Sequence, residues 1–296
     1  MTPDRTAAVL QYLTYPAYIR GMMNLRGRVV PLLVALSLLL VPGASAQEPI
    51  KDNSFLIEEA YNQGRGVVQH INAFSRVAGE GSWLYTFTQE WPFPAQRHQL
   101  SFTLPVQSLH APTGNETGLG DIALNYRYQV IGLEPGRLAF SPRFSVLAST
   151  GSSSRGLGQG GVAFQAGLPL SVEMGKHFFT HWNVGVTRTF SARNTEGNKA
   201  GTTGYSLGQS IVWLAGPKVN LLVETVWSRS QSVVGTGRTQ REDSAFVSPG
   251  IRWAHDFSNG LQIVPGIAFP IGLGPSRGEH AVFVYLSFEH PFRRTP

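Results

Sequence analysis

Hydrophobic and polar residues alternate with a period of two along most of the chain after Val67. Between residues 99 and 106, for example, Leu100, Phe102 and Leu104 alternate with Ser101 and Thr103. Successive side chains of a β-strand point to opposite sides, so such a segment has one apolar face and one small or polar face. The pattern predicts an all-β chain, and it recurs over 122–130, 162–172 and 282–288.

About twelve segments share this alternation, and together they span residues 67–292. Many are longer than the ~5–6 residues of an ordinary strand and match the ~9–11 residues that cross a bilayer. They predict an antiparallel transmembrane β-barrel. The segments are 67–76, 82–92, 97–108, 118–130, 137–148, 161–172, 177–189, 204–214, 219–228, 244–256, 261–270 and 280–292.

The connections between these segments alternate in length. Short turns are expected at 131–136, 173–176, 215–218 and 257–260, and longer polar loops at 109–117, 149–160, 190–203, 229–243 and 271–279. Short periplasmic turns and long extracellular loops are typical of outer-membrane barrels. An even number of strands then places both ends of the barrel sequence on the periplasmic side.

The tryptophans support a membrane-spanning barrel over a soluble β-sandwich or a soluble lipocalin-like barrel. All six, including Trp182, fall on the apolar faces. Trp83 and Trp227 lie near long-loop ends of their segments, whereas Trp91, Trp213 and Trp253 lie near short-turn ends. We expect these five residues to form an aromatic girdle at the two interfaces with the outer-membrane lipid.

The N-terminal region has the features of an export signal. Arg26 and Arg28 precede the uncharged run Val29–Val41, and Ala44-Ser45-Ala46 follows. This order predicts a leader over residues 1–46, cleaved after Ala46. The apolar run is short for a transmembrane helix, which needs about 20 residues. Barrel and leader together predict localisation in the cell outer membrane.

Composition removes several other classes of function. The chain has no cysteine, which excludes disulfides and thiolate metal sites. The leader holds four of the 24 basic and one of the 18 acidic residues, so the remaining chain has 20 basic and 17 acidic residues, a net charge of +3. That charge is too small to indicate nucleic-acid binding.

The polar faces of the strands carry the candidate functional residues, which we expect to line the lumen. Two interpretations remain open: a weakly anion-favouring constriction, or ion pairs that brace the wall, such as Glu224 with Arg252. Arg127 and Arg143 flank the 131–136 turn and are expected to be neighbours, which requires an acid or a solute between them. The expected lumen residues are Arg127, Arg143, Glu224, Arg252, Asn125, Gln165, Asn183 and Asn220.

Catalytic, metal and cofactor motifs are weak. Gly156, Gly158 and Gly161 match G-x-G-x-x-G, but a strand pattern follows instead of a helix, so we expect a flexible outer loop and no cofactor. His177 and His181 share a side but have no third ligand nearby, so no metal is expected.

A lipid-acting hydrolase is the enzymatic alternative. His98 with Ser101, or His255 with Ser258, would have to supply its base and nucleophile. The first two residues point to opposite faces of a strand, and the second two straddle a turn. We therefore expect no enzyme activity.

Short motifs resemble those of a known family. They are Gly118–Asp121 (GLGD), Ser149–Gly151 (STG), Glu58–Gln63 (EEAYNQ) and Gly66–Ile71 (GVVQHI). The chain resembles, over about residues 50–292, the outer-membrane "putative MetA-pathway of phenol degradation" transporter family. The resemblance implies an outer-membrane barrel and a channel for small organic compounds, and no substrate residues are carried over from it.

The two ends of the barrel sequence carry separate expectations. Residues 47–66 form a periplasmic segment that either enters the barrel as a plug or stays disordered, with a short helix over Ser54–Asn62 capped by Asn53 or Ser54. Phe288 and Phe292 resemble the signal read by the barrel-assembly machinery, and 293–296 form a tail.

We therefore expect passive passage of small organic solutes through a polar lumen. A non-conducting structural or surface-interaction barrel is the alternative.

Overall fold

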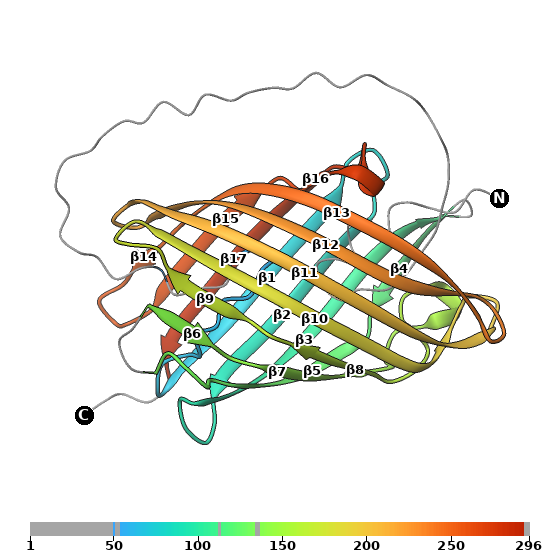
Figure 1. Ribbon diagram of the computed structural model, residues 1–296, viewed down its shortest axis with the longest axis horizontal. Helices are drawn as coiled ribbons and strands as arrows, with labels where there is room; N and C mark the ends of the chain where they lie inside the picture. The colour runs from blue at the N-terminus through green and yellow to red at the C-terminus, as the bar shows by residue number, and fades with distance from the viewer. Residues whose placement is uncertain (1–49, 51–53, 112–113, 134–136, 293–296) are drawn as a thin grey trace.

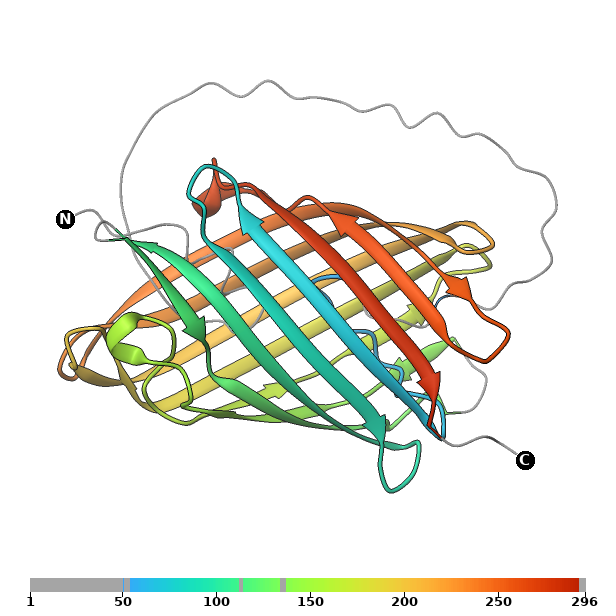
Figure 2. The same cartoon turned by 180° about the vertical axis from the view of Figure 1, so that it is seen from behind.

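The computed structural model describes residue 50 and residues 54–111, 114–133 and 137–292. These residues form a closed antiparallel β-barrel of twelve strands, several of which are interrupted (Figures 1 and 2). This confirms the predicted fold class and strand number. No helix in the described part of the chain is long and apolar enough to span a membrane.

Each predicted segment corresponds to one strand or to two consecutive short strands. Three of the five breaks fall at Pro142, Pro169 and Pro270, since proline cannot donate to the ladder, and the other two fall at Gly120-Asp121 and at Ala254. The strands are β1 (Val67–Val77), β2 (Trp83–Pro92), β3 (His98–Ala111), β4 (Gly114–Leu119) with β5 (Ile122–Tyr128), β6 (Leu138–Phe140) with β7 (Arg143–Ala148), β8 (Ala163–Gly167) with β9 (Leu170–Glu173), β10 (Phe178–Arg193), β11 (Lys199–Gly216), β12 (Val219–Gly235), β13 (Arg238–Trp253) with β14 (His255–Asp256), β15 (Gln262–Ala268) with β16 (Ile271–Gly272), and β17 (Ala281–Pro291).

The barrel closes between its first and last strands. β1 pairs with β2 on one side and with β17 on the other, and Val67 lies opposite Pro291. The start of β1 and the end of β17 therefore lie at the same end of the barrel (Figure 2). The tight turns at 174–177 and 217–218 lie at this end, which we call the periplasmic end.

Two hairpins at the opposite end are longer than the sequence predicts. Most of the expected loops 190–203 and 229–243 is paired strand, because β10–β11 and β12–β13 continue to turns at 194–198 and 236–237. These extensions have few apolar residues, three of which (Ala192, Ala200 and Val233) form a small buried cluster, so the regular alternation that marks a half-apolar strand is lost there although the backbone ladder continues.

Alternation divides the barrel into an apolar exterior and a largely polar interior. Leu124, Val184 and Tyr205 point outward and are at least half exposed. Ser145 and Ser248 point inward and are fully buried. A closed sheet with an apolar outer band suits a lipid environment, because closure leaves no strand at an open edge. The protein is thus an outer-membrane barrel, as the sequence predicts.

Two of the short motifs meet at the extracellular rim. The Asp121 carboxylate accepts hydrogen bonds from the Gly151 and Gln159 amides, at 2.9 and 2.8 Å. A Cβ on Gly158 would lie 2.5 Å from that carboxylate. The loop from 149 to 162, which contains the 3₁₀ helix η1 (Ser153–Arg155), is thus hydrogen-bonded to the wall at the place where a flexible outer loop was expected.

Candidate functional site

The lumen contains the N-terminal residues 54–66, which we call the plug segment. Ser54, Phe55, Ile57 and Ala60 are buried inside the barrel. The segment has no regular secondary structure, so the expected helix over Ser54–Asn62 is not formed. Asn53, the other proposed cap, lies outside the described residues. Of the two arrangements left open for this region, the described residues take the inserted one.

The plug segment lacks a helix because the wall takes its backbone donors. The amides of Leu56 and Ile57 donate to Oε1 of Glu224, at 2.9 and 3.0 Å. The amide of Glu58 donates to Oδ1 of Asn183 at 2.8 Å, and Asn183 donates back to the Glu58 carbonyl at 2.8 Å. The same holds further along, for Ala60 with Ser171 (2.8 Å), Asn62 with Gln129 (3.0 Å) and Gln63 with Gln99 (2.7 Å). Wall side chains thus replace the i−4 carbonyls of a helix.

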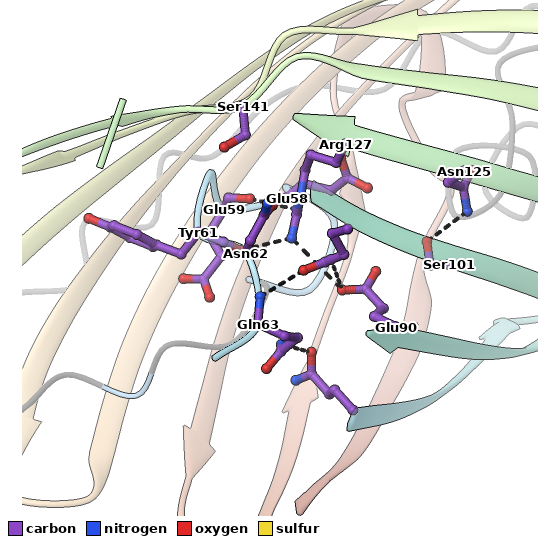
Figure 3. Close-up of polar contacts among 12 residues, drawn as sticks. Glu58, Glu59, Tyr61, Asn62, Gln63, Glu90, Ser101, Asn125, Arg127 and Ser141 are labelled. Atoms are coloured by element: carbon purple, nitrogen blue, oxygen red, sulfur yellow. Dashed lines mark hydrogen bonds and ion pairs between the residues drawn. The ribbon is translucent and has the colours of Figure 1, made fainter. Parts of the chain in front are cut away.

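Arg127, on β5, binds residues 59–62 of the plug segment (Figure 3). Its guanidinium donates to Asn62 Oδ1 at 3.0 Å and to the carbonyls of Glu59 and Tyr61 at 3.0 and 2.8 Å. Glu90 lies 3.9 Å away and compensates the charge. Arg127 is buried, and its planar fork orders three acceptors at once.

Arg143 lies directly across from Arg127 in the sheet register, as expected. It forms an ion pair with Glu58 of the plug segment and donates to Gln165 at 2.8 Å. Two neighbouring arginines repel each other unless an acid lies beside them, and each of these two has such an acid. One acid, Glu90, comes from the wall, and the other comes from the plug segment.

Glu224 and Arg252 do not form the bracing ion pair suggested by the sequence. No such pair occurs among the described residues; Glu224 lies opposite Ser248 in the register, and Arg252 lies opposite Asn220. Each instead holds the N-terminal region, since Arg252 donates to the Ile50 carbonyl at 3.2 Å. The predicted pair was wrong because Arg252 lies four residues along β13 from Ser248, the residue opposite Glu224. The sequence also does not reveal that the N-terminal backbone would be the partner of each residue.

The remaining expected lumen residues also lie on inward faces. Asn125 donates to Ser101 at 3.1 Å, and Gln165 links Arg143 to Thr187. Asn220 is buried near the periplasmic end of β12. All eight expected residues are thus brought to one interior, and five of them directly contact the N-terminal region, four of these through the plug segment: Arg127, Arg143, Asn183 and Glu224. Arg252 is the fifth, through Ile50.

Sequence reasoning missed several wall residues of equal importance. Gln99, Gln129 and Ser171 accept plug amides, and Ser141 donates to the Ala60 carbonyl at 2.6 Å. The Ser171 hydroxyl is in turn hydrogen-bonded to Nδ1 of His181 at 2.7 Å. The alternation along the strands could have identified Gln99, Gln129 and Ser171, because all three lie on the polar faces that it had already marked.

Apolar sockets in the wall hold residues 54–57 of the plug segment. Phe55 packs in a cluster with Phe283 and Tyr285, its ring centroid 5.5 Å from each of theirs. Ile57 packs in a second cluster that includes Phe246. Glycines provide the room: a Cβ on Gly208 would lie 2.1 Å from the end of Ile57, and one on Gly266 would lie 2.5 Å from the Phe55 ring.

The tryptophans occupy the outer face at two levels. Trp91, Trp213 and Trp253 lie toward the periplasmic end of their strands, and Trp213 stacks on Phe178. Trp83 begins β2 at the other end, whereas Trp227, expected near a long-loop end, is the middle residue of β12 because that strand continues to Gly235; Arg229 lies over the Trp227 ring. Anchoring of these five rings at the membrane interfaces stays a prediction.

The weak catalytic and metal candidates are not brought together. His98 bonds Tyr126 on the outer face at 2.7 Å, while Ser101 faces the lumen. His255 and Ser258 are exposed, as is His177, whereas His181 is buried. Within the described residues no three acidic or histidine side chains form a metal-binding group.

The sequence of this plugged barrel matches a known protein family. The family described as "Putative MetA-pathway of phenol degradation" matches residues 58–274, most of the chain. The chain belongs to this family. The match begins within the plug segment and confirms the resemblance drawn from the short motifs. No curated protein matches the sequence.

Solved structures of the same general fold are only distantly related. The COG4313 outer membrane channel from Pseudomonas putida F1 is 11% identical, with a TM-score of 0.56 over 78% of this chain and 97% of that one. A KdgM porin is 10% identical, with a TM-score of 0.45 over 76% of this chain and 99% of that one. The first likeness supports the outer-membrane barrel fold of this family member.

Proposed function

We propose that this family member is an outer-membrane channel for small solutes that the plug segment closes at rest. The observation that carries the proposal is that residues 54–63 occupy the lumen and are held by wall side chains. Passive passage then requires the plug segment to move or to rearrange. The similar structure from Pseudomonas putida, described as an outer membrane channel, agrees with this role.

The character of the plug contacts supports reversible closure. Most of the contacts of residues 58–63 are hydrogen bonds to amide, hydroxyl and guanidinium groups, which water can replace when the plug segment leaves. A lumen evacuated in this way would be lined by amides, serines and threonines and by Arg127, Arg143, Arg252, Glu90 and Glu224, with an apolar strip that includes Phe283 and Tyr285. Such a wall suits small polar or weakly polar solutes.

Planar-bilayer recording of the refolded chain, with and without residues 47–66, tests the proposal. We expect a small or rarely open conductance from the protein with the plug segment, and a larger, steadier one without it. Absence of conductance in both proteins, each shown to be folded, would contradict the channel and favour a structural or surface-interaction barrel. Equal conductance in both would contradict closure by the plug segment.

A further inference from the structure

A cavity remains in the lumen beside the plug segment. Its volume is about 230 Å³, and the N-terminal residues Ser54–Glu58 form part of its lining. Val226 and Ser228 also line it, and they follow Glu224 along β12 toward the extracellular turn at 236–237. The cavity thus lies on the extracellular side of the Glu224 anchor, where a solute arriving from outside would meet the plug segment.

The polar part of the lining comes from one half of the barrel. This half runs in spatial order from β2 through β3, β5, β7 and β8 to β10. Its cavity-facing residues end in hydroxyl, amide or guanidinium groups apart from Ala123 and Glu90. They include Thr88, Thr103, Asn125, Arg143, Gln165 and Asn183.

The opposite half of the barrel gives the cavity an apolar side. It runs from β11 through β12, β13, β15 and β17 to β1. Val226, Phe283, Tyr285 and Ile71 line the cavity there, and Phe55 of the plug segment packs among them. The serines at 206 and 228 are its polar members. The cavity is therefore two-sided, as a site for an amphipathic solute must be.

The lining has one accessible cation, Arg143, which is paired with the carboxylate of Glu58. Arg143 and Glu58 pair with each other, and their side chains are 23% and 25% exposed. The other acid of the lining, Glu90, is buried and accepts a hydrogen bond from Gln99 at 2.6 Å. A solute carboxylate can replace that of Glu58 without leaving Arg143 unpaired, and the displaced Glu58 carboxylate, already 25% exposed, is then solvated by water.

We propose that this cavity binds a small organic acid, whose carboxylate takes the place of Glu58 on Arg143 and whose apolar part packs against Phe283 and Tyr285. Binding removes one anchor of the plug segment and so favours its displacement. At about 30 Å³ per water molecule in the liquid, the cavity holds about seven or eight waters, which suits a single-ring or short-chain acid. This inference rests on the proposed channel for its consequence, and the binding step is independent of conduction.

Calorimetric titration of the folded full chain with three probes tests the binding step. Benzoate has both features, acetate lacks the ring, and benzyl alcohol lacks the charge. We expect benzoate to bind at least about tenfold more tightly than either, a difference of about 1.4 kcal/mol. Equal binding of benzoate and benzyl alcohol would overturn the role of Arg143, and equal binding of benzoate and acetate would overturn the apolar side.

Two variants with opposite expected effects sharpen the test. Arg143→Gln should weaken benzoate binding by at least about tenfold, whereas Glu58→Gln should strengthen it severalfold because the competing carboxylate is gone. Arg229→Gln is the matched control, since Arg229 pairs with Asp243 on the exposed face of the β12–β13 hairpin. Weaker binding in Glu58→Gln, or unchanged binding in Arg143→Gln, would overturn the exchange.

Bilayer recording then separates the inference from the proposed function. Benzoate should raise the open time of the full chain and leave that of the chain without residues 47–66 unchanged. If the shortened chain conducts but the full chain neither binds nor responds to benzoate, the inference fails and the channel stands. If benzoate binds as expected while neither protein conducts, the binding site stands and the channel fails.

Discussion

The two parts of the plug segment are held by different physical interactions. Residues 54–57 insert Phe55 and Ile57 into apolar clusters on the β11–β1 half of the wall, where glycines leave room for them. Residues 58–63 lie against the β2–β10 half and contact it mainly through hydrogen bonds. The first part combines apolar sockets with the hydrogen bonds from the Leu56 and Ile57 amides to Glu224, whereas the second depends on matched donors and acceptors without a socket.

This difference indicates how closure and opening can coexist. Removing an apolar side chain from its socket exposes it to water and leaves a hole, so the first part should resist release. A hydrogen bond exchanged for one with water costs only about 0.5–1.5 kcal/mol net, so the second part should release more readily. We therefore expect opening to begin at residues 58–63, with 54–57 as the firmer anchor.

Filling the Phe55 socket should have the largest effect. A methyl group introduced by Gly266→Ala would lie 2.5 Å from the Phe55 ring, which is rigid. Overpacking typically costs about 1–3 kcal/mol, which would raise the displaced population by about five- to 150-fold. Bilayer recording should show conductance approaching that of the chain without residues 47–66.

The control for this substitution is Gly216→Ala. The methyl group there would come no closer than 3.9 Å, to Val219, so the plug segment should be unaffected. An unchanged open time in Gly266→Ala would show that Phe55 does not hold the plug segment in place.

Removing Arg127 should loosen the second part alone. Arg127→Ala deletes three hydrogen bonds from a charged donor to Asn62, Glu59 and Tyr61. We expect amide hydrogen exchange of residues 58–63 to accelerate by about a hundredfold, or about 2.7 kcal/mol of local opening free energy. Leu56 and Ile57 should keep their protection. Equal acceleration in both parts would mean that they open as one unit.

The sequence revealed the wall better than it revealed the plug segment. Period-two alternation identified every strand, because a strand between lipid and lumen must be apolar on one side only. The same parity placed Arg127, Glu224 and Arg252 in the lumen. It did not show that the N-terminal region would provide their partners: residues 59–62 for Arg127, Leu56 and Ile57 for Glu224, and Ile50 for Arg252. That region has no periodicity that marks these contacts.

The paired hairpin ends were missed for a related reason. In the outer part of this hairpin the exposed face carries Arg229 and Asp243, which pair across the two strands, and the buried face of β12 carries Ser230 and Ser232. A strand without an apolar face has no hydrophobic signature, although its backbone ladder continues. Periodicity therefore reported the part of each strand that crosses the membrane and not the whole strand.

Glu224 offers a smaller and more local test of the first part. Glu224→Ala should free the Leu56 and Ile57 amides, and their exchange should accelerate by about tenfold, or about 1.4 kcal/mol, while Phe55 stays in its socket. Glu224→Gln keeps an acceptor oxygen at the same place and should change exchange much less. If both substitutions act alike, the charge of Glu224 matters more than its position as an acceptor.

Ion selectivity should show the smallest change, and it distinguishes the two original interpretations of the lumen arginines. In the chain without residues 47–66, Arg127, Arg143 and Arg252 would outnumber Glu90 and Glu224, which favours anions weakly. Arg127→Ala and Arg252→Ala in that background should each shift reversal potentials toward cations under a salt gradient. Their effect in the full chain should be smaller, because the plug segment already satisfies both guanidinium groups. If neither substitution shifts selectivity once the plug segment is gone, the arginines serve to hold it and do not select the solute.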